Sequence, residues 1–429
     1  MLRAIYSVLL LLATPLVLLR LIWRGRRQRG YWQHWAERFG HHPGASIKGA
    51  SWLHAVSVGE MRATQPLVTQ LLAAFPQHPI FLSCMTPTGR ATAAELYGTT
   101  SRVTCGYLPY DFAWLHGRLI NNIRPVLLLV METEIWPNLI AACAVHDVPA
   151  WLVNARLSQR SFEGYARLWP VRALIRDALQ GMHGVAAQTA ADAKRLEQLG
   201  TRHVHVTGNV KFDADVDAAL SAKGREWRAA LGGQRRVLLA ASTRDGEEAL
   251  LLQAYLGQYT REGRSGVLLV LVPRHPQRFD AVAHLVLDAG LRLARRSQGD
   301  RPPADIEVWL GDSMGEMAAY IAMCDVAFIG GSLLPLGGQN LIEACAQGKP
   351  VLMGPSVFNF SEAASLAVDA GAMRQANSAE QIMQLAASLL GDDAQREAMA
   401  AAARNFAHAH AGASLRLFNL VADEIRRRR

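Results

Sequence analysis

The run Val126-Leu127-Leu128-Leu129-Val130-Met131-Glu132-Thr133-Glu134-Ile135-Trp136-Pro137 decides the fold class. Residues 126–131 are continuously apolar, which predicts a short strand that is buried on both faces. A helix-like segment follows at 135–146. A buried strand that leads directly into a helix is the repeating unit of a parallel α/β sheet.

The same alternation continues on both sides of this run. Short apolar runs predict strands at 51–57, 80–84, 126–131, 150–153, 236–241, 266–272, 306–310, 326–329 and 351–353. Amphipathic stretches between them predict helices at 62–74, 135–146, 190–199 and 340–347. Such alternation implies parallel sheets of right-handed βαβ units, with ligands bound beyond the carboxyl ends of the strands.

The chain has 429 residues, of which 50% are hydrophobic and 19% charged. This length is enough for two domains, and the composition excludes a disordered chain or a coiled coil. A polar stretch at 213–235 interrupts the alternation and is predicted to be a linker. We therefore expect domains at 24–212 and 236–429, with the active site in the cleft between them.

The N-terminus has the pattern of a membrane anchor. Residues 4–19 carry no charge, and with Arg20 reaching the interface the apolar run extends to Trp23, about 20 residues, enough to span a bilayer. The basic cluster at 24–29 follows the apolar run, which is opposite to the order in a cleaved signal peptide and predicts a cytoplasmic body. A spanning anchor at 1–23 is expected; a helix lying in the interface or one buried against the body are the alternatives.

The net charge of +9 comes from the two ends of the chain, and the body between them is close to neutral. This distribution argues against a nucleic-acid groove, which needs basic residues along one face, and suits an anionic membrane surface. The 5 cysteines are scattered without the spacing of a zinc site, which is typical of buried residues in a reducing compartment.

Three charged residues in the first half are candidates for chemistry. Glu60 follows the predicted strand 51–57 after Gly59, where a carboxylate can act as a general base or simply favour the first turn of a helix. Glu132 and Glu134 come directly after a buried strand, where a charge is costly. Either acid is therefore expected to have a chemical role, to pair with another group, or to cap the next helix. Lys211, near the presumed hinge, can neutralise a leaving phosphate or be solvated surface.

In the second half, three elements at strand ends are expected to converge on one ligand. They are Pro273-Arg274-His275-Pro276, Met314-Gly315-Glu316, and the glycine-rich pair Gly330-Gly331-Ser332-Leu333 and Gly337-Gly338-Gln339-Asn340. Glycines let the backbone approach a phosphate, and Glu343, one turn into the following helix, can reach a ribose. The motifs of P-loop ATPases, zincins, α/β-hydrolases and dinucleotide dehydrogenases are absent from the sequence.

These residues resemble a known family, the 3-deoxy-D-manno-octulosonic acid (Kdo) transferases of Gram-negative bacteria. The motifs that carry the resemblance occur in order at 54–60, 85–89, 108–111, 131–137, 154–158, 273–276, 311–316 and 351–355. The similarity extends from the N-terminus to about Phe360. Two positions depart from some relatives, Gln339 in place of His and Asn209 in place of Ser.

The resemblance implies a GT-B glycosyltransferase, with an acceptor-binding N-terminal domain and a CMP-sugar-binding C-terminal domain, both Rossmann-like. It implies transfer of Kdo, with inversion, from CMP-Kdo to the tetra-acylated lipid A precursor at the cytoplasmic face of the inner membrane. CMP-Kdo is then the donor substrate, and no metal or other cofactor is expected.

The resemblance also assigns roles to single residues. Glu60 matches the general base, and Glu132 and Lys211 match positions that stabilise the transition state. The residues that match the CMP-binding positions are Pro273, Arg274, Met314, Gly315, Glu316, Asn340, Leu341, Ile342 and Glu343. The alternatives are another membrane-associated GT-B transferase, such as one using a UDP-sugar, and a tethered nucleotide-binding module without catalysis.

Overall fold

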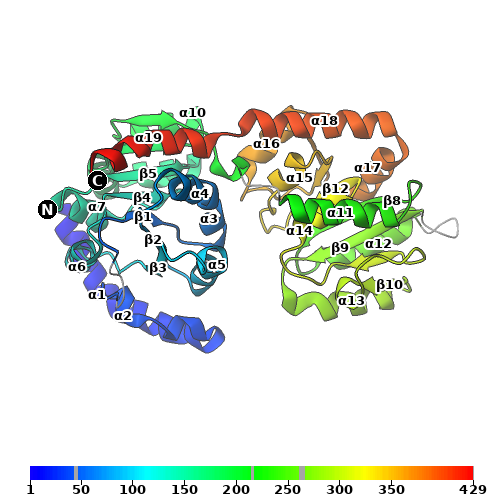
Figure 1. The fold of residues 1–429 in the computed structure, drawn as a ribbon, viewed down its shortest axis with the longest axis horizontal. Coiled ribbons are helices and arrows are strands. Elements are labelled where there is room, and N and C mark those ends of the chain that lie inside the picture. Colours follow the sequence, from blue (N-terminus) through cyan, green and yellow to red (C-terminus); the bar gives the residue numbers. More distant parts are fainter. Residues whose placement is uncertain (43–46, 214–216, 260–265, 429) are drawn as a thin grey trace. The chain divides into compact units, whose positions relative to one another are not determined.

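Two parallel sheets of seven strands each organise the chain in its computed structural model, which describes residues 1–42, 47–213, 217–259 and 266–428. Each sheet lies in one of two units, the first formed by Met1–Ala214 with Ala411–Arg429 and the second by Asp215–His410 (Figure 1). The predicted class, two Rossmann-like parallel-sheet units, is confirmed.

The sheet of the first unit has the order β3-β2-β1-β4-β5-β6-β7. Its strands are β1 Ser51–His54, β2 Ile80–Cys84, β3 Val103–Tyr107, β4 Leu127–Met131, β5 Ala150–Ala155, β6 Gly184–Ala187 and β7 Val204–Val206. β1 pairs with β4 from Ser51 opposite Leu127 to His54 opposite Val130. The direction of winding reverses between these two strands, so ligands are expected beyond the ends of β1 and β4.

Helices cover both faces of this sheet. One face carries α6 Ala113–Ile123, α7 Pro137–Val145, α9 Trp169–Gln180 and α10 Ala190–Gln198. The other carries α3 Val58–Ala63, α4 Gln65–Ala74, α5 Pro87–Tyr97 and α19 Ala413–Arg427. Alternate residues point to opposite cores, with Trp52 and Val130 in one and Leu53 and Leu129 in the other. Each fully buried aliphatic side chain stabilises the fold by about 1.5–3 kcal/mol, which explains why these strands are apolar throughout.

The sheet of the second unit has the order β10-β11-β9-β8-β12-β13-β14. Its strands are β8 Arg236–Thr243, β9 Val267–Pro273, β10 Leu293–Arg295, β11 Val308–Leu310, β12 Val326–Ile329, β13 Val351–Met353 and β14 Met373–Gln375. Its helices are α11 Ala218–Ala230, α12 Glu247–Tyr259, α13 Phe279–Asp288, α14 Met317–Met323, α15 Ile342–Ala346, α16 Ser361–Asp369, α17 Ala379–Gly391 and α18 Asp393–His410. Here the winding reverses between β8 and β12.

The remaining elements are short, apart from the first helix. They are α1 Leu2–Arg27, α2 Trp35–Arg38, α8 Gln159–Arg167 and the 3₁₀ turns η1 Arg29–Trp32, η2 Val210–Asp213, η3 Pro276–Arg278 and η4 Arg296–Gln298. In the described part of the chain, α1 is the one helix that is long and apolar enough to cross a membrane.

The segment 213–235, predicted as a linker, differs from that expectation, although 214–216 lie outside the described residues. Most of it forms α11, whose buried face carries Ser221, Gly224 and Trp227 at helical spacing. A Cβ at Gly224 would lie 2.2 Å from the carbonyl oxygen of Ala319, so glycine is needed where α11 packs on α14. The charges on its outer face conceal this narrow packing stripe in the sequence.

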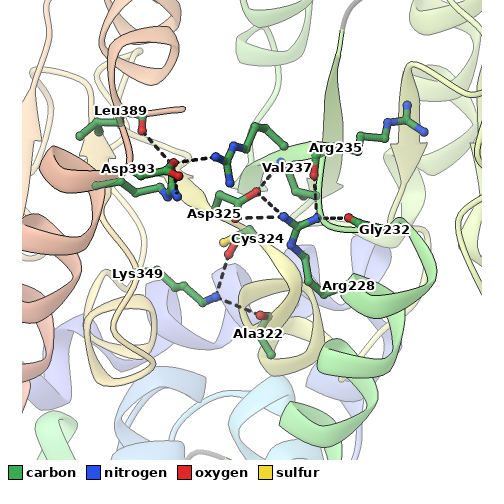
Figure 2. A network of polar contacts seen from close by, with 12 residues as sticks. Arg228, Gly232, Arg235, Val237, Ala322, Cys324, Asp325, Lys349, Leu389 and Asp393 are labelled. Carbon is green, nitrogen blue, oxygen red and sulfur yellow. Dashed lines mark hydrogen bonds and ion pairs between the residues drawn. The ribbon is translucent and has the colours of Figure 1, made fainter. Parts of the chain in front are cut away.

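A polar network attaches α11 to the sheet. Arg228 of α11 pairs with Asp325, and the same carboxylate accepts a 2.7 Å hydrogen bond from the backbone N of Val237. Lys349 donates to the carbonyls of Ala322 and Cys324 nearby, as Figure 2 shows. These charges lie where β8 and β12 begin, at the edge opposite to the expected ligand side, and they hold strands and helices together.

The predicted second domain, 236–429, also ends differently. α19 packs against α4 of the first unit (Figure 1) and buries Leu417, Val421 and Ile425, which are spaced four residues apart. The carboxylate of Asp213 accepts hydrogen bonds from the backbone N of Gly412, at 2.5 Å, and of Ser414. The chain therefore leaves the first unit after η2 and returns to it before α19.

Candidate active site

Glu60 lies in the first turn of α3, just beyond the end of β1. Ser57 caps this helix and its Oγ accepts the backbone N of Glu60 at 3.3 Å. The Glu60 carboxylate accepts hydrogen bonds from Ser57 Oγ at 2.9 Å and from the backbone N of Val56, the residue before the cap, at 2.8 Å, an arrangement similar to a capping box. Burial, and then the nearby charge of Glu132, raise the pKa of Glu60 to about 7. Glu60 thus serves the helix and also titrates near neutral pH.

Glu132 follows β4 immediately and lies on the same side of the sheet. Its backbone has a φ of +59°, and its N donates to the carbonyl of Val153 at 2.9 Å. A residue with a side chain in this left-handed region costs about 1–3 kcal/mol, and such strain is concentrated at functional sites. The turn directs the Glu132 carboxylate to Lys211, whose Nζ lies 2.7 Å from Oε1.

Lys211 is positioned by two asparagines. The backbone N of Val210 donates to Asn154 Oδ1 at 3.1 Å, and the backbone N of Lys211 donates to Asn209 Oδ1 at 3.0 Å. The three residues predicted from the first half are therefore brought together by β1, β4 and η2. Lys211 forms an ion pair with one of the two acids, Glu132, and the other, Glu60, has a raised pKa.

The contacts of Glu132 and Glu134 show whether these acids cap the next helix. α7 begins at Pro137 and has no side-chain cap, so neither Glu132 nor Glu134 caps it. Glu134 Oε2 instead accepts the indole Nε1 of Trp136 at 3.0 Å. Burial raises the pKa of Glu134, and the Trp136 hydrogen bond opposes that shift.

In the second unit, the residues predicted to bind CMP come from the ends of β9, β11 and β12. Pro273 ends β9, and the backbone N of Arg274 donates to the carbonyl of Thr243 at 2.9 Å. Met314 is 58% exposed, and Gly315 has a φ of +80° with open space where a Cβ would be. This open backbone can admit a ligand.

Glu316, next in the chain, is already engaged. Its Oε1 lies 2.6 Å from Lys223 Nζ and 3.1 Å from Arg296 Nη2. Burial would raise the pKa of Glu316, but hydrogen bonds from Lys223, Ser313 and Arg296 outweigh it and hold the pKa below its ordinary value. Glu316 therefore positions this loop as an ion-pair partner.

The group at 340–343 contributes mostly through its backbone. Leu341 and Ile342 are buried, so their side chains pack in the interior. Asn340 Oδ1 accepts the backbone N of Ile342 at 3.0 Å, and its Nδ2 donates to Glu343 Oε1 at 2.9 Å. Asn340 and Glu343 remain as polar side chains at the carboxyl end of β12.

The glycine-rich loop after β12 was expected to offer backbone donors to a phosphate, and in its first part, Gly330–Leu333, three of these donors are already used. Glu247, fully buried at the start of α12, accepts the backbone N of Gly331 at 2.6 Å and those of Ser332 and Leu333 at 2.9 Å. It also accepts the backbone N of Arg244 at 2.9 Å. The donors that a phosphate would use are already bound to an internal carboxylate.

Sequence reasoning missed Arg244, which follows β8 at the point where the winding reverses. Within the described ranges its guanidinium makes no hydrogen bond or ion pair. Arg244, Arg274 and Arg278 surround His275: burial lowers the pKa of His275, and these three cations lower it further. A cationic group at this position suits an anionic ligand. Its place directly after a predicted central strand was the available signal.

Comparison with known proteins relates the chain to one family. The family model "3-Deoxy-D-manno-octulosonic-acid transferase (kdotransferase)" matches residues 33–214. The chain is 43% identical to the 3-deoxy-D-manno-octulosonic acid transferase of Bordetella pertussis, over 98% of this chain and 99% of that protein. It is 34% identical to the enzyme of the same name from Haemophilus influenzae, over 99% of both.

The chain belongs to the Kdo transferase family. It is therefore a glycosyltransferase of lipopolysaccharide biosynthesis, and its matched region contains Glu60, Glu132 and Lys211.

Solved structures place this Kdo transferase among known folds. A UDP-GlcNAc 2-epimerase from Neisseria meningitidis is 15% identical, with a TM-score of 0.59 and coverage of 89% of this chain and 100% of that one. A putative UDP-N-acetylglucosamine 2-epimerase from Listeria monocytogenes has a TM-score of 0.58 at 16% identity, over 86% and 95%. At this identity the likeness concerns the fold, and it agrees with the GT-B class.

Proposed function

We propose that this Kdo transferase moves Kdo from CMP-Kdo to a sugar hydroxyl of the tetra-acylated lipid A precursor, with inversion and with Glu60 as the general base. The observation that carries the proposal is the position of Glu60, just beyond the end of β1 and near the ion pair of Glu132 with Lys211. Burial and the charge of Glu132 raise the pKa of Glu60 there to about 7. A base is most effective when its pKa lies near the working pH, because it is then both available and strong enough to accept a proton.

The transfer step needs one base and one stabilised leaving group. The acceptor hydroxyl attacks the anomeric carbon of Kdo and gives its proton to the Glu60 carboxylate. The bond between that carbon and the phosphate oxygen breaks, and CMP leaves with the electron pair. Attack on the face opposite to CMP inverts the anomeric centre.

The Glu132–Lys211 pair supports this step from the same side of the first unit. Lys211 Nζ lies 2.7 Å from Glu132 Oε1, so the two side chains hold each other in place. A fixed cation stabilises negative charge that develops on a phosphate, and a fixed carboxylate stabilises the positive charge of an oxocarbenium-like transition state.

The second unit supplies the donor site in this proposal. Arg244 and Arg274 both lie near His275, after β8 and β9. The open backbone at Gly315 and the polar pair Asn340 and Glu343 follow β11 and β12, at the same edge of the sheet. CMP-Kdo carries a phosphate and the carboxylate of Kdo, and arginine binds both groups with paired hydrogen bonds. A single phosphate leaving group can be stabilised by such cations without a metal.

We place the reaction at the cytoplasmic face of the inner membrane, where α1 holds the enzyme beside an acylated acceptor. The basic residues that follow the apolar run of α1 suit the anionic lipids of this face. The competing function is transfer from a UDP-sugar, because the fold alone does not distinguish nucleotides.

The deciding experiment presents the solubilised enzyme with the acylated precursor and freshly generated CMP-Kdo, and weighs the lipid by mass spectrometry. The proposal expects added Kdo masses, whose number also gives the count of residues transferred. Parallel reactions with UDP-sugars test the competing function. An unshifted lipid, beside a working control enzyme, contradicts the proposed donor or acceptor.

A further inference from the structure

The first helix has two different faces along its whole length. Its half-buried or buried positions recur at helical spacing, at Tyr6, Ser7, Leu10, Ala13, Thr14, Val17, Leu18, Leu21 and Gly25. The exposed apolar positions form the opposite face, at Ile5, Val8, Leu9, Leu11, Leu12, Leu16, Leu19, Ile22 and Trp23. α1 packs against α7 and α9, so one face lies on the body along the helix and the other is open.

Polar contacts fix the N-terminal end of α1 to the body. Tyr6 Oη donates to Asp111 Oδ2 at 3.0 Å, and Asn138 Nδ2 donates to Ser7 Oγ at 2.9 Å. Asp111 is itself buried, pairs with His116 at 3.0 Å, and accepts the backbone N of Leu139 at 2.9 Å. These contacts join the start of α1 to the rigid start of α7.

The other end of α1 is held as well. Trp32 of η1 folds back, and its indole Nε1 donates to the carbonyl of Ile22 at 3.1 Å. Leu21 is 7% exposed there. Tyr6 and Ile22 are separated by about 24 Å along the axis at 1.5 Å per residue. Both ends of α1 are therefore attached to the same unit, the start directly to α7 and the end through η1, and the two attachments are separated by nearly the thickness of a bilayer.

These contacts argue against a spanning helix. If α1 crossed the bilayer with its basic end at one surface, Tyr6 would lie at the opposite surface. Asp111, Asn138 and the sheet attached to them would have to lie within the hydrocarbon or beyond it. Polar backbone and charged groups are not tolerated there without strong compensation.

We propose that α1 lies in the plane of the membrane surface, with its exposed apolar face on the acyl chains and its N-terminus on the same side as the body. Arg3, Arg20 and Arg24 are exposed along the helix and can reach lipid phosphates from this orientation. Leu168 and Trp169 are 59% and 71% exposed at the start of α9, against which α1 packs, and they add a second interfacial contact.

A labelling experiment separates the two orientations. The full chain is bound to sealed phosphatidylethanolamine–phosphatidylglycerol vesicles with its body outside, as single-site variants Arg3→Cys and Ala229→Cys. Both sites are exposed, and Arg3 lies on the side of α1 away from its exposed apolar face. Wild-type protein, with four of its five cysteines buried, gives the background. An impermeant maleimide added outside should label both variants equally. Protection of Arg3→Cys until the vesicles are lysed would overturn the proposal.

Depth measurements give an independent answer. Spin labels at Ile5→Cys, Leu12→Cys and Leu19→Cys should report similar shallow depths from oxygen and nickel-chelate accessibility. A spanning helix would place the middle label deepest, and a helix that stays on the protein would give no depth at any site. Either result contradicts an in-plane helix. Neither readout depends on Kdo transfer, so failure here leaves the proposed reaction standing.

Discussion

The carboxyl ends of the central strands are used differently in the two units. In the first, Glu60, Glu132 and Lys211 meet beyond β1 and β4 in a partly buried group where one acid is paired and the other titrates near neutral pH. In the second, Glu247 binds backbone donors of the loop after β12, and Glu316 pairs with Lys223 of α11 and Arg296 of η4. The acids of the second unit are thus engaged in structural contacts, whereas the first unit keeps a carboxylate with a raised pKa, to which we assign the reaction.

This difference shows that a charged residue at a strand end can have either a structural or a chemical role, depending on its neighbours. A carboxylate surrounded by backbone N–H donors, as Glu247 is, accepts the hydrogen bonds that an anionic ligand could otherwise accept, and it makes the loop rigid. A carboxylate that is buried beside another acid, as Glu60 is, has a raised pKa and can accept and release a proton near neutral pH. The predictions below test each side of the comparison.

The largest effect is expected at Glu60. Glu60→Gln keeps the shape and the helix cap but removes the base, so the transfer rate should fall about 10²–10⁴-fold. CMP binding, measured by calorimetry, should stay unchanged because the donor residues lie in the other unit. Glu134→Gln is the matched control, an acid from the same region held by Trp136, and a similar loss there would remove Glu60 from its role.

The next effect concerns stability of the second unit. Glu247→Ala leaves the backbone donors of Gly331, Ser332 and Leu333 without their buried acceptor, at a cost of about 1–3 kcal/mol for each unmatched group, partly recovered by water. We expect about 2–4 kcal/mol less stability in urea unfolding of the second-unit transition. Glu226→Ala, at an exposed position on α11, should change it little. Equal stability of the two variants would contradict a structural role for Glu247.

The third prediction concerns Arg244, whose guanidinium is expected to bind the anionic donor substrate in the second unit. Arg244→Ala should weaken donor binding by about 10-fold, because one charge-assisted hydrogen bond contributes about 1.5–3 kcal/mol. The rate at saturating donor should change less, since the base is elsewhere. Arg225→Ala, exposed on α11, is the control. Unchanged donor affinity in Arg244→Ala would remove it from the site.

The smallest effect is a shift in pH dependence. Transfer should rise with pH through a midpoint near 7 as Glu60, with its pKa raised to about 7, loses its proton. Lys211→Gln leaves Glu132 unbalanced and should move the midpoint upward, and Glu132→Gln should move it downward, each by up to about 1 pH unit. Both variants will also be slower, so the midpoint of the profile is the readout. Shifts in the same direction would contradict the electrostatic coupling of the three residues.

Much of the fold could be predicted because its central strands are buried on both faces. β2, β12 and β13 match the predicted runs to the residue. The strands that were not predicted, β3, β6, β7, β10 and β14, lie toward the sheet edges, where shorter and more polar segments suffice. α11 was hidden by its charged outer face, and α19 looked like a continuation of the second domain.

The sequence by itself determined the two parallel sheets, the apolar first helix, and the acids and lysine at the strand ends, because periodicity and residue type are local properties. It could not determine which charges meet. Glu60 and Glu132 are far apart in the chain and adjacent only because β1 pairs with β4. Tertiary structure likewise decided that Glu247 accepts the backbone donors of the glycine-rich loop, that α19 returns to the first unit, and that Tyr6 contacts Asp111. The physical reason is that burial and Coulomb energies depend on distance in space.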